Sequence, residues 1–264
     1  MYMLVIYSVL CLAAVVLSDP AVVPSPGYGY AVDVDTAVPA ESFVCMKEAG
    51  YSAAFIRGYD YSGEGSLDAN AAANIKNAQK AGLHTEVFMP PHRGKGKFAS
   101  QQIEELYEGL KSNGITLKRV WIQVHEENKW TSNFRANFAF LKELANAAKE
   151  KYGLSIGYFT SKYEWSIFMK KSAPVDTTLW YSNINDMGES GETPANFDDF
   201  EAFSVFTQPV IKQFGRKETR CLFNESSQIL TSKKGNSILC LHPIVENLIF
   251  TINVSINVYS RTNT

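Results

Sequence analysis

The amino-acid sequence predicts an α/β fold in which parallel strands and helices form a barrel in a single domain. The chain has 264 residues, of which 45% are hydrophobic and 20% are charged, as is usual for a globular domain with one sizeable core. Short apolar segments alternate with longer segments of helical periodicity. This alternation is typical of parallel strands joined by right-handed crossovers, and at this length it favours a barrel over two small sheets.

The expected elements follow one another from residue 30 to residue 181. A lead-in segment rich in proline and glycine, 19–29, precedes the first strand. The expected strands are 30–34, 53–57, 85–89, 119–124, 155–159 and 178–181, and the expected helices are 40–49, 68–81, 98–112, 133–151 and 162–170. The pairs Asn113-Gly114 and Tyr152-Gly153 supply helix stops.

The alternation of strands and helices fades near residue 215. We therefore expect the barrel to occupy 30–215 and to be followed by a divergent C-terminal tail, 216–264. Within the tail, apolar and polar residues alternate strictly over 250–258, which indicates a half-buried strand. Three interpretations stay open: an added edge strand, a loose tail, or the product of a wrongly joined reading frame.

Residues 1–18 are expected to be a signal peptide. Their apolar run is shorter than a membrane span, and Val16 and Ser18 suit signal peptidase. Secretion to the extracellular space follows, although the missing basic residue before the run leaves an uncleaved anchor as the alternative. The mature chain would then carry Cys45, Cys221 and Cys240, an odd set that gives one disulfide and one spare thiol.

Several classes of partner are disfavoured by the sequence. A formal net charge of -2 argues against a nucleic-acid partner and against a cationic membrane agent, so no membrane contact is expected beyond the signal peptide. The histidines and cysteines lack zinc spacing, and the glycine pairs lack a phosphate-binding context, so neither a metal nor a cofactor is expected.

Polar residues at strand ends are the candidates for chemistry, because barrel enzymes place their sites where the strands end. These residues are Asp33, Asp35, Arg57, Glu86, the run 123–127 and the run 181–185. We expect them to converge on one mouth of the barrel.

The chain resembles animal members of glycoside hydrolase family 25, the Chalaropsis-type lysozymes, from residue 30 to residue 214. The resemblance rests on an ordered set of segments: Tyr30-Ala31-Val32-Asp33-Val34, Phe55-Ile56-Arg57-Gly58-Tyr59, Val120-Trp121-Ile122, Gly157-Tyr158-Phe159-Thr160-Ser161, Leu179-Trp180-Tyr181 and Pro209-Val210-Ile211-Lys212-Gln213-Phe214. It implies an irregular TIM-like (β/α) barrel and cleavage of the β-1,4 bond between the amino sugars of peptidoglycan, often by secreted antibacterial or digestive enzymes.

The resemblance places the family's first carboxylate on Asp33. The alternative role for an Asp at this position is to cap the following helix. In the family, the corresponding strand ends in Asp-x-Glu, and the Glu is the general acid. In this chain those two positions are Gln123 and His125. Glycoside cleavage normally uses two carboxyl groups, so the catalytic pair is incomplete. We keep His125 as a candidate proton donor, although a strand-end histidine hydrogen-bonded in the sugar cleft fits better. Glu126 or Glu127 replaces the missing acid only if a bulge or an early end of the strand turns it into the cleft.

The remaining candidates would bind the substrate or hold the fold. Trp180 and Tyr181 are expected to contact sugar rings, and Gln123 is expected to hydrogen-bond there. Arg57 and Glu86 are expected to form an ion pair that lines the mouth. Under the resemblance, Cys45 and Cys221 are the expected disulfide.

Three functional hypotheses follow. The first is a secreted lysozyme-like protein of innate defence that binds bacterial cell-wall glycan with weak or absent hydrolysis. The second is an active muramidase that uses Asp33 with Glu126 or Glu127. The third is a non-catalytic secreted interaction or signalling protein on the same fold.

Overall fold

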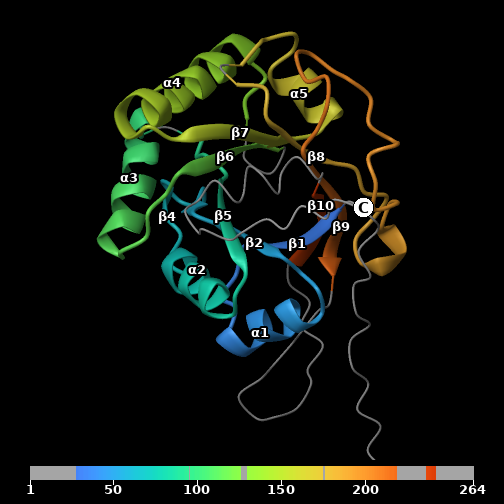
Figure 1. Ribbon diagram of the computed structural model, residues 1–264. Coiled ribbons are helices and arrows are strands. Elements are labelled where there is room, and N and C mark those ends of the chain that lie inside the picture. The colour runs from blue at the N-terminus through green and yellow to red at the C-terminus, as the bar shows by residue number, and fades with distance from the viewer. Residues whose placement is uncertain (1–27, 95, 126–129, 175, 219–235, 242–264) are drawn as a thin grey trace, which may run out of the picture.

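The protein folds as a closed barrel of eight strands in the order β1-β10-β9-β8-β7-β6-β5-β2 (Figure 1). The computed structural model describes residues 28–94, 96–125, 130–174, 176–218 and 236–241. The strands are β1 Gly29–Val34, β2 Ala53–Arg57, β5 His84–Met89, β6 Arg119–Val124, β7 Ser155–Thr160, β8 Leu179–Ser182, β9 Ile211–Glu218 and β10 Asn236–Leu241. The predicted single-domain α/β barrel is confirmed.

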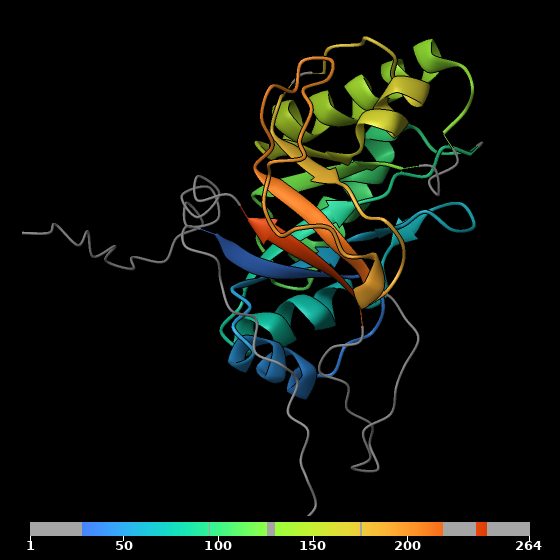
Figure 2. The same cartoon turned by 90° about the vertical axis from the view of Figure 1, so that its right-hand side faces the viewer.

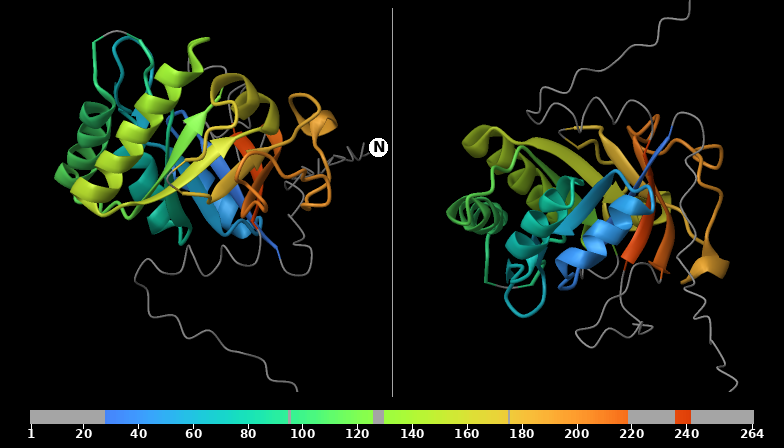
Figure 3. Two further views of the ribbon diagram at one scale, coloured as in Figure 1. Left: turned by 90° about the horizontal axis from the view of Figure 1, so that it is seen from above. Right: turned by 60° about the horizontal axis from the view of Figure 1, so that its bottom comes forward.

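Helices connect the first parallel strands and cover the outside of the sheet. They are α1 Ala40–Glu48, α2 Ala71–Lys80, α3 Ala99–Ser112, α4 Phe134–Tyr152 and α5 Lys162–Phe168. A two-stranded sheet of β3 Tyr59–Asp60 and β4 Ser66–Leu67 lies between β2 and α2 in the chain. Helices α3 and α4 pack side by side, as Figure 3 shows from above. The predicted helix stops are confirmed, because α3 ends before Gly114 and α4 ends at Gly153, each with a positive φ.

The barrel closes through strands that do not follow the alternating pattern. A long segment, 183–210, separates β8 from β9 and contains a short 3₁₀ helix, Glu189–Gly191. Strand β10 is antiparallel to both of its neighbours, β9 and β1. Figure 2 shows this side of the barrel, with β10 in red between β9 in orange and β1 in blue. The sheet therefore extends beyond residue 215, whereas the predicted strand over 250–258 lies outside the described residues.

An aromatic layer fills the inside of the barrel. Its members come from alternate positions of the strands and are Ala31, Ala53, Phe55, Phe88, Trp121, Phe159, Trp180 and Ile211. The rings of Phe159 and Trp180 stack with their centroids 3.7 Å apart. Gly157 is required beside this layer, since a Cβ atom there would lie 2.2 Å from Cε3 of Trp121. A second apolar core lies outside the sheet, beneath the helices. The inner layer thus closes the barrel and forms a solid floor under its mouth.

No helix in the part of the chain that the structure describes has both the length and the apolar character to cross a membrane.

Candidate functional site

A polar pocket opens above the aromatic floor, at the ends of the barrel strands. It encloses about 630 Å³, part of which is open solvent. We call it the mouth pocket, and its lining residues are Asp33, Asp35, Arg57, Tyr61, Phe88, Pro90, Gln123, His125, Phe159, Gln213, Arg216 and Lys217. The structure therefore brings together five of the strand-end residues singled out by the sequence: Asp33, Asp35, Arg57, Gln123 and His125.

Asp33 is held in the mouth pocket by a chain of hydrogen bonds. The Nε2 amide of Gln213 donates to Oδ2 of Asp33 over 3.1 Å, and Oε1 of Gln213 accepts from Oγ of Ser182 over 2.8 Å. The Asp33 side chain is almost buried, at 7% exposure. Helix α1 begins after Pro39 without a side-chain cap, so capping this helix is not the role of Asp33. The arrangement presents one oriented carboxyl group to a ligand.

Arg57 lies at the rim of the pocket among three carboxylates. Its Nε is 2.6 Å from Oδ2 of Asp68, and its terminal nitrogens lie 3.7 Å from Asp35 and 3.9 Å from Asp60. Burial tends to raise the pKa of Asp60, but the hydrogen bonds from Ser62 and the charge of Arg57 outweigh it and lower that pKa. Arg57 therefore organises the acidic rim, and the carboxylate of Asp35 has a cation beside it.

The predicted ion pair between Arg57 and Glu86 is wrong. Glu86 is buried at 2% exposure, where it accepts a 2.9 Å hydrogen bond from Nε1 of Trp121 and lies 3.5 Å from Arg119. Its position on β5 is two residues before Phe88, which pairs with Trp121 in the sheet. Glu86 therefore lies inside the barrel below the mouth, and burial raises its pKa against the opposing effects of Arg119 and Trp121.

Gln123 and His125 both reach the mouth pocket from the end of β6. Nδ1 of His125 lies 2.9 Å from Oε1 of Glu164, and its ring packs against Phe159 at a centroid distance of 4.9 Å. A carboxylate at Nδ1 favours the tautomer with the proton on that nitrogen and fixes the orientation of the ring. His125 is thus a positioned, hydrogen-bonded residue of the cleft. Glu126 and Glu127 lie outside the described residues, so their role stays a prediction.

Glu164 is a site residue that the sequence analysis did not identify. It lies in the first turn of α5, where its backbone N–H donates to Oγ of Ser161 and its Oε2 accepts from the same hydroxyl over 2.9 Å. The Ser-x-x-Glu spacing before a helix is the sequence signal that would have found it. Helix capping therefore fixes the carboxylate that in turn holds His125.

The sugar contacts expected of Trp180 and Tyr181 must be corrected. Trp180 is fully buried in the aromatic floor, stacked on Phe159. Tyr181, the next residue of β8, faces the opposite side of the sheet because strand side chains alternate, and it is 5% exposed. The aromatic rings that line the mouth pocket belong instead to Tyr61, Phe88 and Phe159.

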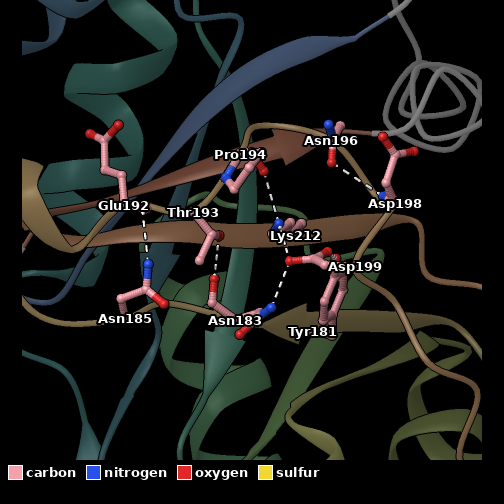
Figure 4. A network of polar contacts seen from close by, with 10 residues as sticks. All are labelled: Tyr181, Asn183, Asn185, Glu192, Thr193, Pro194, Asn196, Asp198, Asp199 and Lys212. Atoms are coloured by element: carbon pink, nitrogen blue, oxygen red, sulfur yellow. Dashed lines mark hydrogen bonds and ion pairs between the residues drawn. The ribbon is translucent and has the colours of Figure 1, made fainter.

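Tyr181 belongs to a polar network outside the barrel (Figure 4). Its hydroxyl donates to Asp199, which also accepts from Asn183 over 2.6 Å and from the buried Lys212 over 2.6 Å. Nζ of Lys212 also donates to the carbonyl of Pro194 over 2.8 Å. Partial burial would raise the pKa of Asp199, but the three hydrogen bonds that it accepts and the charge of Lys212 lower it. The network fixes the segment 183–210 against β8 and β9.

A second depression adjoins the mouth pocket and shares two residues with it. We call it the side groove, and it is lined by His125, Ser161, Tyr163, Glu164, Ser182, Asn183, Ile184 and Arg216. His125 and Arg216 line both depressions, and the side chain of Tyr163 is exposed. The two together form a polar surface across the ends of β6, β7, β8 and β9.

Two further sequence predictions concern cysteines and metals. Cys45 lies on α1, but Cys221 lies outside the described residues, so the bridge between them stays a prediction. Among the residues that the structure describes, no group of three or more His, Cys, Asp or Glu side chains is placed to hold a metal ion.

Comparison with known proteins identifies the family. A family model described as Lysozyme-like protein 1 matches residues 24–214. Lysozyme-like protein 7 of Caenorhabditis elegans is 38% identical over 211 residues, which cover 78% of this chain and 74% of that protein. Probable GH family 25 lysozyme 2 of Dictyostelium discoideum is 30% identical over 192 residues, which cover 72% of this chain and 85% of that protein.

Solved structures agree with this assignment at the level of the fold. A muramidase from Trichobolus zukalii superposes with a TM-score of 0.59 at 15% identity, covering 84% of this chain and 97% of that one. A family GH25 lysozyme from Aspergillus fumigatus superposes with a TM-score of 0.58 at 12% identity, covering 86% and 100%. The matched family model, the similar sequences and the shared barrel show that the chain belongs to the lysozyme-like proteins of the glycoside hydrolase family 25 type.

Proposed function

We propose that the protein binds the β-1,4-linked amino-sugar glycan of peptidoglycan in the mouth pocket and hydrolyses it weakly or not at all. Membership of a lysozyme family supports the substrate class. The pocket itself suits a sugar, since it combines aromatic rings with oriented amide, hydroxyl and carboxylate groups. We further propose that the protein is secreted and acts in innate defence, which rests on the apolar N-terminal segment and on the substrate class.

The chemistry of the lining residues carries the proposal of impaired hydrolysis. Among the described residues, the carboxylates that line the mouth pocket are Asp33 and Asp35. Asp35 pairs with Arg57, and Gln123 has no ionisable proton. Glycoside cleavage requires one carboxylic acid to protonate the leaving oxygen and a second carboxylate across the bond. Asp33 supplies one of these groups, and the described residues at the end of β6, Gln123 and His125, supply no second carboxyl group.

His125 is a poor replacement for the general acid. Its Nδ1 is committed to Glu164, so only Nε2 is left to transfer a proton. After transfer the imidazole is neutral, whereas the glutamate of a retaining enzyme becomes a base that activates water in the second step. The same hydrogen bond makes His125 a well-oriented partner for a sugar hydroxyl or amide, which favours binding over cleavage.

The proposal is tested by measuring binding and cleavage in the same preparation. Purified protein is sedimented with insoluble peptidoglycan, and new reducing ends are counted in the same tubes, for the natural chain and for Asp33→Asn. We expect co-sedimentation of both proteins and a release of reducing ends by the natural chain that is close to the Asp33→Asn background. Binding and release of reducing ends are measured in the same way for the variants Glu126→Gln and Glu127→Gln.

The outcomes separate the alternatives. Release of reducing ends that disappears in Asp33→Asn and in either glutamine variant would show an active muramidase that uses Asp33 with Glu126 or Glu127. A folded protein that neither sediments with peptidoglycan nor cleaves it would favour a secreted interaction protein on the same fold.

A further inference from the structure

An apolar depression lies on the outside of the barrel, separate from the mouth pocket. We call it the helix pocket, and it lies between α4, the outer face of β7 and the segment that follows α5 (Figure 1). Its lining residues are Phe138, Leu141, Lys142, Tyr158, Ala173 and Pro174. None of these described residues lines the mouth pocket or the side groove, so the proposed glycan site does not account for the helix pocket.

The helix pocket has a firmly packed apolar base. Leu141 is 1% exposed, and Tyr158 is fully buried. The ring of Tyr158 packs edge-on against the rings of Trp165 and Phe206, with centroids 5.8 and 6.2 Å away. The pocket encloses about 350 Å³, part of which is open solvent, near the lower limit for ligand pockets. It therefore fits one aliphatic side chain better than a whole small-molecule ligand.

The rim of the helix pocket is positively charged. Lys142 lines the pocket, and Lys170 and Lys171 come two or three residues before Ala173 in the chain. We call Lys142, Lys170 and Lys171 the rim lysines, and all three are exposed. Arg135, also exposed, lies seven residues before Lys142 and so on the same face of α4. The cations on this side of the molecule thus come from two neighbouring elements.

The acidic residues that flank the pocket in the chain are engaged elsewhere. Glu143 accepts a 2.9 Å hydrogen bond from Oγ of Ser100 on α3. Asp176 lies 3.7 Å from Nζ of Lys149. Among the residues that the structure describes, no carboxylate forms an ion pair with any of the rim lysines. A negatively charged partner would therefore meet cations that the fold leaves available.

Lys170 occupies a backbone position that favours glycine. Helix α5 ends at Phe168, and the N–H of Lys170 donates to the carbonyl of Trp165 over 3.0 Å with a φ of 58°. Glycine is the usual residue where a helix ends in this left-handed conformation, because a Cβ atom is crowded there. The chain thus keeps a cation beside the pocket where an uncharged glycine would be under less strain.

We propose that the helix pocket binds an acidic segment of a partner protein. One apolar side chain of that segment would enter the pocket, and carboxylates on either side of it would meet the rim lysines. A concave pocket receives a side chain, whereas a lipid surface takes up apolar side chains that project from the protein. The shape of the site therefore favours a polypeptide over a membrane.

The parts of this chain outside the described residues do not match the site in charge. Asp19 is the one charged side chain of 1–27. The segment 219–235 carries Arg220, Lys233 and Lys234 against Glu225, and in 242–264 Arg261 balances Glu246. The acidic segment is therefore assigned to another protein.

The test uses random dodecapeptides displayed on phage and selected on the immobilised full chain. Enriched peptides are synthesised, and their affinities are measured by calorimetry for the natural chain, Lys142→Gln, Lys170→Gly and Ala173→Phe. Lys76→Gln is the matched control, since Lys76 is exposed on α2 and lines none of the three depressions.

We expect the enriched peptides to carry an apolar residue flanked by Asp or Glu. Lys142→Gln and Lys170→Gly should each weaken binding about tenfold, as for one charge-assisted contact, and added salt should weaken it further. Ala173→Phe should abolish binding by filling the pocket. Lys170→Gly also relieves the strained backbone, so its urea midpoint should not fall and its weaker binding cannot come from unfolding. Lys76→Gln should bind like the natural chain.

Four results would overturn the inference. The first is the enrichment of no peptide, or of peptides without carboxylates, and the second is equal binding of the enriched peptides by the natural chain and the three pocket variants. The third is self-association in sedimentation velocity that Lys142→Gln abolishes, which would make a second copy the occupant. The fourth is binding to phosphatidylserine vesicles that Lys142→Gln abolishes, which would assign the rim lysines to a lipid surface.

Discussion

At the scale of single residues, the site depends on a histidine held by a carboxylate. Glu164 fixes His125 through Nδ1, and Ser161 fixes Glu164. His125 directly follows β6, whereas Glu164 lies in α5, and both α4 and β7 come between them in the chain. The hydrogen bond therefore joins two segments that are far apart in the sequence. The orientation of the ring is therefore set by the fold as a whole, and a single substitution can release it.

We predict that Glu164→Gln changes the tautomer of His125. The carboxylate accepts the Nδ1 proton, whereas a glutamine amide can turn to accept or to donate, so selection between the ring nitrogens weakens. Ring ¹⁵N chemical shifts, recorded at a pH where the histidine is neutral, should show the Nδ1-protonated form in the natural chain and a mixed form in the variant. Glu201→Gln, on an exposed pair with Lys162, is the control. An Nε2-protonated His125 in the natural chain would refute the assignment.

A second prediction concerns the floor of the pocket. Gly157→Ala places a methyl group against Trp121, and overpacking of this kind costs about 1–3 kcal/mol of the free energy of unfolding. Ser155→Ala, at an exposed position of the same strand, should change that free energy by less than about 0.5 kcal/mol. Urea denaturation of both variants measures the difference. Equal stability of Gly157→Ala and the natural chain would show that the floor is loosely packed.

At the scale of elements, the sequence predicts most of the barrel and little of its closure. The helices α1 to α5 and the strands β1, β2 and β5 to β8 lie within about three residues of the expected ranges, because each has a clear apolar period and most are bounded by turn residues. Strand β10 was not predicted. It is antiparallel to β9 and lies beyond residue 215, where the alternation of strands and helices in the sequence has faded, so that alternation carries no signal for it.

The sequence predicts those site residues whose place in the barrel depends only on the order of the parallel strands. Asp33, Gln123 and His125 reach the mouth because they end parallel strands of one barrel. Glu86 and Trp180 were misplaced because depth along a strand depends on register, which the sequence does not reveal. Arg216 and Lys217 were missed because the expected barrel ends at residue 215, whereas strand β9 continues to Glu218.

The network around Lys212 makes an element-scale prediction about pH. Replacing this buried lysine in Lys212→Met leaves Asp199 without its cation, at a cost of about 2 kcal/mol of stability near neutral pH, a value reduced because Asp199 is partly exposed. The matched control Lys162→Met removes an exposed ion pair and should cost little. Urea denaturation at neutral pH measures both.

The sign of the pH effect follows from the lowered pKa of Asp199. A carboxyl whose pKa is lower in the folded state stabilises the protein fully above its unfolded pKa of about 3.9. That stabilisation is lost as the pH falls through the lower, folded pKa. The difference in stability between the natural chain and Lys212→Met should therefore narrow as the pH is lowered from 5 toward 2. A difference that stayed constant over that range would show that Lys212 does not act through Asp199.

At the scale of the whole molecule, the proposed biology depends on export of the chain. We predict that the exported protein begins at Asp19, after loss of 1–18, and that a non-reduced peptide map joins Cys45 to Cys221. Mass spectrometry of protein recovered from the medium of expressing cells tests both statements. Full-length chain retained in membranes would support the uncleaved anchor, and a map that joins Cys45 to Cys240 would correct the disulfide.

The whole barrel also offers a way to test the proposal that the residues at the end of β6, Gln123 and His125, leave the protein with weak or absent hydrolysis. The double variant Gln123→Asp with His125→Glu places acids at the end of β6, and the new glutamate would lie beside the buried Glu164. Like charges at short distance raise the pKa of one member of such a pair, which is the state that a general acid needs. The two single variants are the matched controls, since each restores only one group.

The most direct measurement is the rate at which reducing ends are released from purified peptidoglycan by the natural chain and by this double variant, each beside its Asp33→Asn counterpart. We predict release close to background for the natural chain and a gain for the double variant that Asp33→Asn abolishes. Turnover by the natural chain that Asp33→Asn abolishes, with no gain in the double variant, would contradict the proposal that hydrolysis is impaired because Gln123 and His125 replace acids at the end of β6.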